Sequence, residues 1–141
     1  EATKKVVQDG ADEVDVVMNI GAFLSENYAH VADEIESVLT LCHMSNKALK
    51  VIIETCLLSD AQIAKACEIC TDKEVDFVKT STGVNGPGAD VRIVKMMREI
   101  LPKSIKIKAS GGIKDYETAM RMIDAGADRI GTSSGFKILG A

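Results

Sequence analysis

Lysine residues stand near the ends of two segments whose apolar residues are typical of buried β-strands. Lys79 follows Phe77 and Val78, and Lys108 lies near the end of the segment SIKIKAS (104–110). Lysine is among the residues least often found fully buried, so a lysine delivered by a buried strand suggests chemistry. An ammonium group beside another cation has a lowered pKa, which makes free amine available near neutral pH. An amine of that kind can attack a carbonyl group and form a Schiff base.

An aspartate completes this chemical set. Asp15 belongs to the strand-like segment DGADEVDVV (9–17), and alternation along a strand places it on one face with Val17 and Asn19. A carboxylate with a bridging water can carry the protons that Schiff-base formation requires. For each residue alone, the alternative is a lysine that reaches solvent or an aspartate that caps a turn. Three such residues at the same end of three strands favour the chemical interpretation.

Two further groups of residues accompany this set. Lys50 and Glu54 lie on the strand-like segment ALKVIIET (48–55), and we expect them to support the site through ion pairs or hydrogen bonds. The clusters SGG (110–112) and TSSG (132–135) end successive strands and lead into helices. Backbone N–H groups at such places bind anions, and glycine permits close approach, so we interpret the clusters as a phosphate site. Ordinary tight turns are the alternative.

The elements that must position these residues alternate along the chain. The strand-like runs are 9–17, 48–55, 72–80, 104–110 and 125–133, and the segments with helical periodicity are roughly 25–44, 59–73, 89–101 and 115–125. Ser59 and Asp115 are suited to begin helices, and Gly126 is suited to end one. Strict alternation of strand and helix predicts parallel strands with helical crossovers. An open doubly wound sheet is the alternative, but no glycine-rich dinucleotide fingerprint follows an early strand.

The position of the polar residues favours a (β/α)8 TIM barrel, because that fold builds its active site at the carboxyl ends of its strands. A closed barrel of this type needs eight strands and about 250 residues. We therefore expect residues 1–141 to form a single domain, the C-terminal portion of a barrel with five of its βα units. Residues 1–10 have a helical pattern. An incomplete barrel leaves unpaired sheet edges, so we expect the isolated piece to be poorly soluble or inactive.

Composition and charge exclude several classes of protein. The net charge is −4, and the aromatic residues are three Phe and two Tyr. Without a basic stripe or a long apolar run, we expect no nucleic-acid partner, no membrane partner and a cytoplasmic location. The motif CEIC (67–70) lies in an amphipathic helical pattern without further metal ligands, which predicts ordinary thiols. A homodimer is the expected assembly, because dimers are the commonest.

Five motifs in order resemble those of the deoxyribose-phosphate aldolases, which are class I aldolases. The motifs are GADEVDVV, LKVIIET, DFVKTSTG, IKASGGI and RIGTSSG, and the resemblance runs from residue 1 almost to residue 141. It implies a (β/α)8 barrel that acts on a phosphosugar without a metal or organic cofactor. The implied reaction is the reversible cleavage of 2-deoxy-D-ribose 5-phosphate to acetaldehyde and D-glyceraldehyde 3-phosphate.

The resemblance also implies a role for individual residues. Lys79 matches the Schiff-base lysine, Lys108 matches the second lysine that perturbs it, and Asp15 matches the acid/base. The positions that match the family's phosphate site are Gly83, Gly112, Ser133 and Ser134, with Gly111 and Thr82 adjacent.

One departure and two alternatives stay open at this point. Lys106 stands where the family usually has glycine, so it either adds a third cation to the face of Lys108 or points away. The first alternative function is another phosphosugar-binding barrel enzyme, such as a transaldolase-like enzyme or an isomerase. The second is an inactive, truncated chain that serves as a scaffold.

Overall fold

Strands and helices alternate through the part of the chain that the computed structural model describes, residues 7–8 and 12–131. The strands are β1 (Val7–Gln8), β2 (Glu13–Val17), β3 (Ala48–Ile52), β4 (Phe77–Lys79), β5 (Lys106–Ser110) and β6 (Arg129–Gly131). The helices are α1 (Ile20–Leu24), α2 (Tyr28–Met44), α3 (Asp60–Lys73), α4 (Val91–Ile100) and α5 (Tyr116–Ala125), with a 3₁₀ turn, η2 (Thr55–Leu57).

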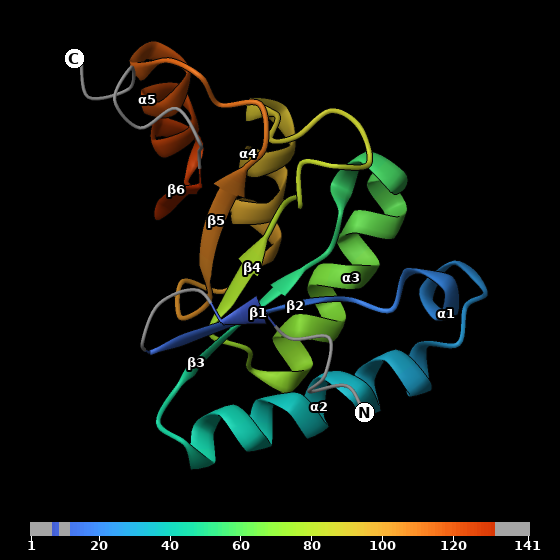
Figure 1. The fold of residues 1–141 in the computed structure, drawn as a ribbon. Helices are drawn as coiled ribbons and strands as arrows, with labels where there is room; N and C mark the ends of the chain where they lie inside the picture. Colours follow the sequence, from blue (N-terminus) through green and yellow to red (C-terminus); the bar gives the residue numbers. More distant parts are fainter. Residues whose placement is uncertain (1–6, 9–11, 132–141) are drawn as a thin grey trace.

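Strands β2 to β6 form a parallel sheet in sequence order, β2-β3-β4-β5-β6. Each helical connection therefore returns the chain to the position beside the strand it has just left, as in a βα barrel. Helices α2, α3, α4 and α5 pack on one another in this order and form a single layer along the strands (Figure 1). The predicted α/β architecture with parallel strands is confirmed.

An ion pair shows that the sheet is strongly curved. Glu13 on β2 accepts a hydrogen bond from the guanidinium of Arg129 on β6, although four strand spacings separate the two strands. Neighbouring strands lie about 4.8 Å apart, so a flat sheet would place β2 and β6 about 19 Å apart. Two side chains cannot span that distance. The sheet therefore curls until its first and last parallel strands face each other, as the wall of a barrel does.

The expectation of a helical pattern in residues 1–10 is wrong for Val7 and Gln8. These two residues form β1, which pairs antiparallel with β2 opposite Asp15 and Val14. The edge of β2 away from β3 carries backbone donors and acceptors, and an extended segment satisfies them better than a helix does. The rest of residues 1–10 lies outside the described residues.

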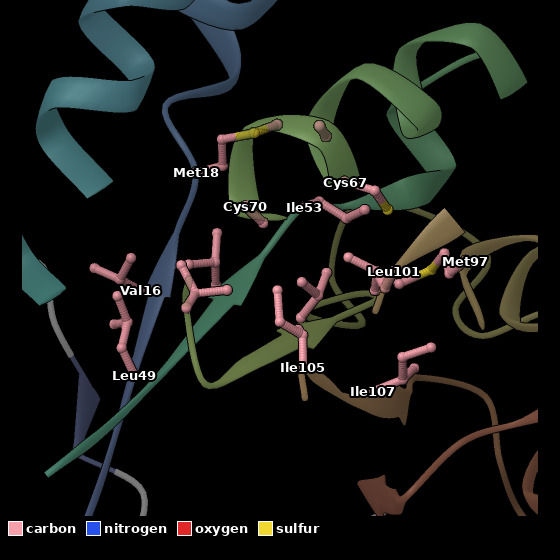
Figure 2. Close-up of a cluster of buried hydrophobic side chains, with 14 of the residues drawn as sticks. Val16, Met18, Leu49, Ile53, Cys67, Cys70, Met97, Leu101, Ile105 and Ile107 are labelled. Carbon is pink, nitrogen blue, oxygen red and sulfur yellow. The ribbon is translucent and has the colours of Figure 1, made fainter. Parts of the chain in front are cut away.

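The hydrophobic core lies between the sheet and the helical layer. Strand residues at alternate positions, such as Val16, Leu49 and Ile107, belong to one buried cluster with the helix residues Cys67 and Met97 (Figure 2). Every second strand residue thus faces the helices, which leaves the intervening residues on the concave face of the sheet.

The cysteines of the CEIC motif belong to this core. Cys67 and Cys70 are fully buried with free thiols, as expected of ordinary thiols on an apolar helix face. Burial raises the pKa of the Cys67 thiol to about 12 and raises the pKa of the Cys70 thiol as well. Such thiols stay protonated, and protonated thiols are poor nucleophiles.

Helix boundaries follow the residues that were expected to set them. Ser59 caps α3 in a capping box with Gln62, and the Asp115 side chain accepts a hydrogen bond from Thr118 N at the start of α5. Gly126 ends α5 with a φ of 124°. The predicted helix 25–44 begins only at Tyr28, and α1 precedes it as a separate short helix that the periodicity did not predict.

The capping box gives a stability prediction. Replacing Ser59 by Ala removes the acceptor for Gln62 N and should lower the free energy of unfolding by about 1 kcal/mol. Ser37→Ala is the matched control, because the Ser37 hydroxyl bonds only to a carbonyl within an exposed part of α2. Urea unfolding of both variants measures the difference. Equal stabilities would contradict the capping role of Ser59.

Candidate active site

The concave face of the sheet carries charged residues at successive levels. Pairing places Asp15, Lys50, Phe77 and Lys106 at one level of four adjacent strands. One step toward the carboxyl ends, Lys79 on β4 pairs with Lys108 on β5. Paired positions of a parallel sheet point to the same side, so both lysines face the interior of the curve.

Asp15, on the first parallel strand, lies between two lysines of this face. Lys79 Nζ donates a hydrogen bond of 3.0 Å to Asp15 Oδ2. Lys50 Nζ lies 3.4 Å from Oδ1, the oxygen on the other side of the carboxylate. Asp15 is 7% exposed and Lys50 is fully buried, so these charges interact with little screening by water. The predicted association of Asp15 with Lys79 is therefore present in the structure.

The side chain of Lys108 lies on the same face, in space that is open because residue 131 on β6 is a glycine. A Cβ atom at Gly131 on β6 would lie 3.0 Å from Lys108 Cε and 2.3 Å from Ser110 Oγ. Any side chain at Gly131 would therefore displace Lys108 and Ser110. The structure brings Lys79, Lys108 and Asp15 to one face, as the sequence predicted.

Lys50 connects Asp15 to a second carboxylate. Its ammonium group lies 2.9 Å from Glu13 Oε1, and Glu13 also pairs with Arg129. The hydrogen bond from Lys50 holds the pKa of Glu13 below its usual value, with a smaller contribution from Arg129, against the opposing effect of burial. The expected supporting role of Lys50 thus takes the form of ion pairs with both acidic residues of β2.

Phe77 lies among cations on the same face. Arg129, Lys50 and Lys106 have their charged groups 4.7, 5.8 and 5.9 Å from the centre of its ring. Cations within about 6 Å of an aromatic face are attracted to it. Lys106 therefore stays on the face of Lys108 instead of pointing away, one level nearer the amino ends of the strands.

The hydroxyl groups after Lys79 attach the chain to the neighbouring strands. The Thr80 hydroxyl donates to the carbonyl of Ser110 and accepts from its N–H, both at 3.0 Å. The Thr82 hydroxyl donates to Glu54 Oε2 at 2.6 Å. Glu54, expected to form an ion pair or a hydrogen bond, thus holds the loop that carries Thr82.

The glycines of the predicted phosphate site come together at the carboxyl ends of β4 and β5. Gly83, Gly111 and Gly112 all have positive φ angles, of 91°, 89° and 73°. A Cβ at Gly83 would lie 3.9 Å from Gly111 Cα, whereas a Cβ at Gly112 would meet no atom within 4 Å. Gly83 and Gly111 are therefore in ordinary van der Waals contact, and the space beside Gly112 is open. Ser133 and Ser134, the other two predicted positions, lie outside the described residues.

Sequence reasoning missed three residues of the concave face, namely Glu13, Phe77 and Arg129. Strand parity could have found the first two, since Glu13 is two residues before Asp15 and Phe77 two before Lys79. Arg129 needs the curvature of the sheet, because its partner lies 116 residues away in the chain.

Two kinds of site are not found in the part of the chain that the structure describes. No group of three or more His, Cys, Asp or Glu side chains there is arranged to hold a metal ion. Among the same residues, no helix is long and apolar enough to cross a lipid bilayer.

Comparison with known proteins agrees with this geometry. The model of the DeoC/LacD family of aldolases matches residues 1–141. The chain belongs to the DeoC/LacD aldolase family. Among family members, the deoxyribose-phosphate aldolase of Clostridium tetani is 52% identical over 138 residues, which are 97% of this chain and 63% of that protein. The enzyme of Thermococcus kodakarensis is 48% identical over 136 residues, 96% of this chain and 61% of that protein.

A solved structure of another aldolase has the same fold as this DeoC/LacD chain. The structure of QR15, an aldolase, superposes with a TM-score of 0.86 at 46% identity and covers 93% of this chain. This chain in turn covers 58% of that structure. The chain thus spans about 60% of the length of the curated relatives it matches. The five parallel strands of this chain are about the same fraction of the eight strands of a complete barrel.

Burial of Lys50 between two carboxylates gives a prediction. Lys50→Met leaves Glu13 and Asp15 close together without their shared cation and should lower the free energy of unfolding by about 3–5 kcal/mol. Lys65→Met is the control, because the ion pair between Lys65 and Glu68 lies at the surface and should contribute about 1 kcal/mol or less. Denaturant unfolding measures the free energy of unfolding of both variants. If Lys50→Met is as stable as Lys65→Met, the ion-pair argument is wrong.

The lowered pKa of Glu13 gives a prediction about acid stability. A carboxyl group whose pKa is lower in the folded protein adds stability that is fully present above the pKa of the unfolded chain, about 4.5. That stability is lost as the pH falls through the folded pKa. Between pH 6 and pH 3, unfolding free energy should therefore decline less steeply in Glu13→Gln than in the unmodified protein.

The effect of Arg129 on the same titration provides an internal check. Arg129→Gln should reduce the slope of unfolding free energy against pH by less than Glu13→Gln does, because Lys50 has the larger effect on Glu13. Identical slopes in all three proteins would contradict the role of Glu13.

Proposed function

We propose that the protein carrying this chain is a class I aldolase that reversibly cleaves 2-deoxy-D-ribose 5-phosphate to acetaldehyde and D-glyceraldehyde 3-phosphate. The observation that carries the proposal is the hydrogen bond of 3.0 Å between Lys79 Nζ and Asp15 Oδ2 on the concave face, with Lys108 on the adjacent strand. Membership of the DeoC/LacD family and the names of the relatives support the same activity.

The first half of the reaction uses the amine of Lys79. This nitrogen attacks C1 of the open-chain sugar, the resulting carbinolamine loses water, and a protonated Schiff base forms. Asp15 lies within hydrogen-bond distance of Nζ and carries protons between the nitrogen and the departing hydroxyl group. Lys108 supplies a second cation beside the nucleophile. Lys50 holds Asp15 from the side opposite to Lys79.

The second half breaks the bond between C2 and C3. A base takes the proton of the hydroxyl group on C3 of the sugar, and C3 becomes the aldehyde carbon, C1, of glyceraldehyde 3-phosphate. The electron pair of the C2–C3 bond moves toward the Schiff base. The resulting enamine takes a proton at C2, and water then releases acetaldehyde and restores Lys79. No electrons are gained or lost overall, so the reaction as written needs neither an oxidant nor a reductant.

The phosphate group of the substrate would bind at the carboxyl ends of β4, β5 and β6. Gly83 and Gly111 adjoin each other there, and Gly112 has open space beside it. We assign the phosphate to the N–H groups of these glycines, together with Ser133 and Ser134. Backbone N–H groups that converge on one place are a common way to bind phosphate. We further propose a homodimer and a cytoplasmic location for the protein.

The proposal predicts a covalent adduct. Incubation with acetaldehyde and sodium borohydride should reduce the Schiff base and attach an ethyl group to Lys79, which peptide mass spectrometry would detect. Lys79→Arg should abolish the adduct and the turnover of deoxyribose 5-phosphate, because an arginine does not form a Schiff base under these conditions.

Substrate choice separates this aldolase from other barrel enzymes. The protein should turn over deoxyribose 5-phosphate and leave ribulose and fructose phosphates unchanged. An adduct on another lysine, or preferred turnover of fructose phosphate, would contradict the proposal.

A further inference from the structure

Glu54 is a buried acidic residue in an unusual backbone conformation at the end of β3. It is 1% exposed, and its φ of 55° and ψ of 65° lie in the left-handed region, which residues other than glycine seldom adopt. Such conformations persist where the surrounding structure enforces them, and they concentrate at functional sites. The contacts of the Glu54 side chain show what enforces this one.

Both carboxylate oxygens of Glu54 accept hydrogen bonds from the loop that follows Lys79. Oε1 accepts from the backbone N–H of Thr82 at 2.8 Å, and Oε2 accepts from the Thr82 hydroxyl at 2.6 Å. Oε2 also accepts from Asn85 Nδ2 at 2.7 Å. Three donors from two residues of the loop, Thr82 and Asn85, therefore converge on one side chain that follows β3.

Between the amides that make these bonds lies one amide, that of Gly83, for which the described residues provide no hydrogen-bond acceptor. The N–H of Thr82 bonds to Glu54, and the N–H of Val84 bonds to the Thr82 hydroxyl at 3.3 Å. Gly83 stands between these two residues with a φ of 91°, beside Gly111. Because the amides on both sides are bonded to Glu54 and to the Thr82 hydroxyl, the internal hydrogen bonds of the loop pass over the N–H of Gly83.

The same loop is attached directly to the backbone that carries Lys79. Ile53 N donates to the Lys79 carbonyl at 3.1 Å, and Thr55 N donates to the Thr80 carbonyl at 2.9 Å. Glu54 lies between these two donors. On the other side, Thr80 is bonded to Ser110 of β5. Backbone bonds from Ile53 and Thr55 thus fix Lys79 and Thr80 on the β3 side. The Glu54 side chain adds the attachment of Thr82 and Asn85.

We propose that Glu54 is a positioning residue that holds the Gly83 amide in place to bind a phosphate group. In the reaction proposed above, on which this inference rests, that group is the phosphate of deoxyribose 5-phosphate. Glu54 does not touch the substrate. It acts through Thr82 and Asn85, and it therefore determines preference for phosphorylated substrates and not the chemistry at Lys79.

The test compares Glu54→Gln with the unmodified gene product that carries this chain. Gln keeps the size of the side chain but replaces one acceptor oxygen by an NH₂ donor, which cannot accept from Thr82 or Asn85. We expect the ratio of kcat/KM for deoxyribose 5-phosphate to kcat/KM for unphosphorylated 2-deoxyribose to fall about tenfold or more, since small misplacements of binding groups have effects of this size. The rate of borohydride trapping with acetaldehyde at Lys79 should stay the same.

Two further variants keep the test decisive if Glu54→Gln folds poorly. Thr82→Val removes the hydroxyl bond to Glu54 but keeps the backbone N–H, and Asn85→Ala removes only the side-chain amide. Both should lower the same ratio by smaller factors. Glu68→Gln, on the exposed surface of α3, is the control and should leave the ratio unchanged. An equal loss of activity with both substrates would show that Glu54 only stabilises the fold, and it would overturn the inference.

Binding of inorganic phosphate separates failure of this inference from failure of the proposed reaction. In the unmodified protein, added phosphate should shift the amide resonance of Gly83, and Glu54→Gln should weaken this binding at least as much as it lowers the activity ratio. If deoxyribose 5-phosphate is not cleaved but this difference in phosphate binding is seen, the proposed reaction is wrong and the role of Glu54 stands. If cleavage occurs and Glu54→Gln binds phosphate equally well, the role of Glu54 is wrong.

Discussion

The position of the Asp15 carboxylate between two ammonium groups is the interaction on which the site depends. Lys79 bonds to one oxygen at 3.0 Å, and buried Lys50 lies 3.4 Å from the other. Removing a charge from water is costly, so three charged groups remain together on this face only because each offsets the burial of another. Lys50 also pairs with Glu13, which ties Asp15 to the ion pair that Glu13 makes with Arg129 across the curve of the sheet. The ion pairs of the site therefore continue from Asp15 through Lys50 and Glu13 to the last parallel strand, β6.

Much of this arrangement was predictable from local sequence patterns. The order of strands and helices follows from periodicity, and residues such as Ser59 and Asp115 set helix boundaries through short-range hydrogen bonds. The common face of Lys79 and Lys108 follows from strand parity once the strands are parallel, because paired residues of adjacent strands point the same way. These features depend on interactions within one element or between two neighbouring strands, and the sequence encodes such interactions directly.

Other features depend on contacts that no local pattern records. The sequence placed Thr82 beside the predicted phosphate site, but its hydroxyl donates to Glu54, which follows β3. Arg129 pairs with Glu13 on a strand four positions away in the sheet. This ion pair could be predicted only if the curvature of the sheet were known. Val7 and Gln8 form a strand because they pair with the open edge of β2, although their own sequence has a helical pattern. In each case the residue forms hydrogen bonds with a segment that is distant in the sequence, and these bonds determine its conformation or its partner.

The most direct test of the account is a crystal structure of the gene product after trapping with acetaldehyde and borohydride. The account predicts an ethyl group on Lys79 Nζ, with the Asp15 carboxylate within hydrogen-bond distance of that nitrogen and Lys108 on the same face. Electron density for the adduct on Lys106 or Lys108 would contradict it. So would an adduct on Lys79 whose nitrogen has no contact with Asp15.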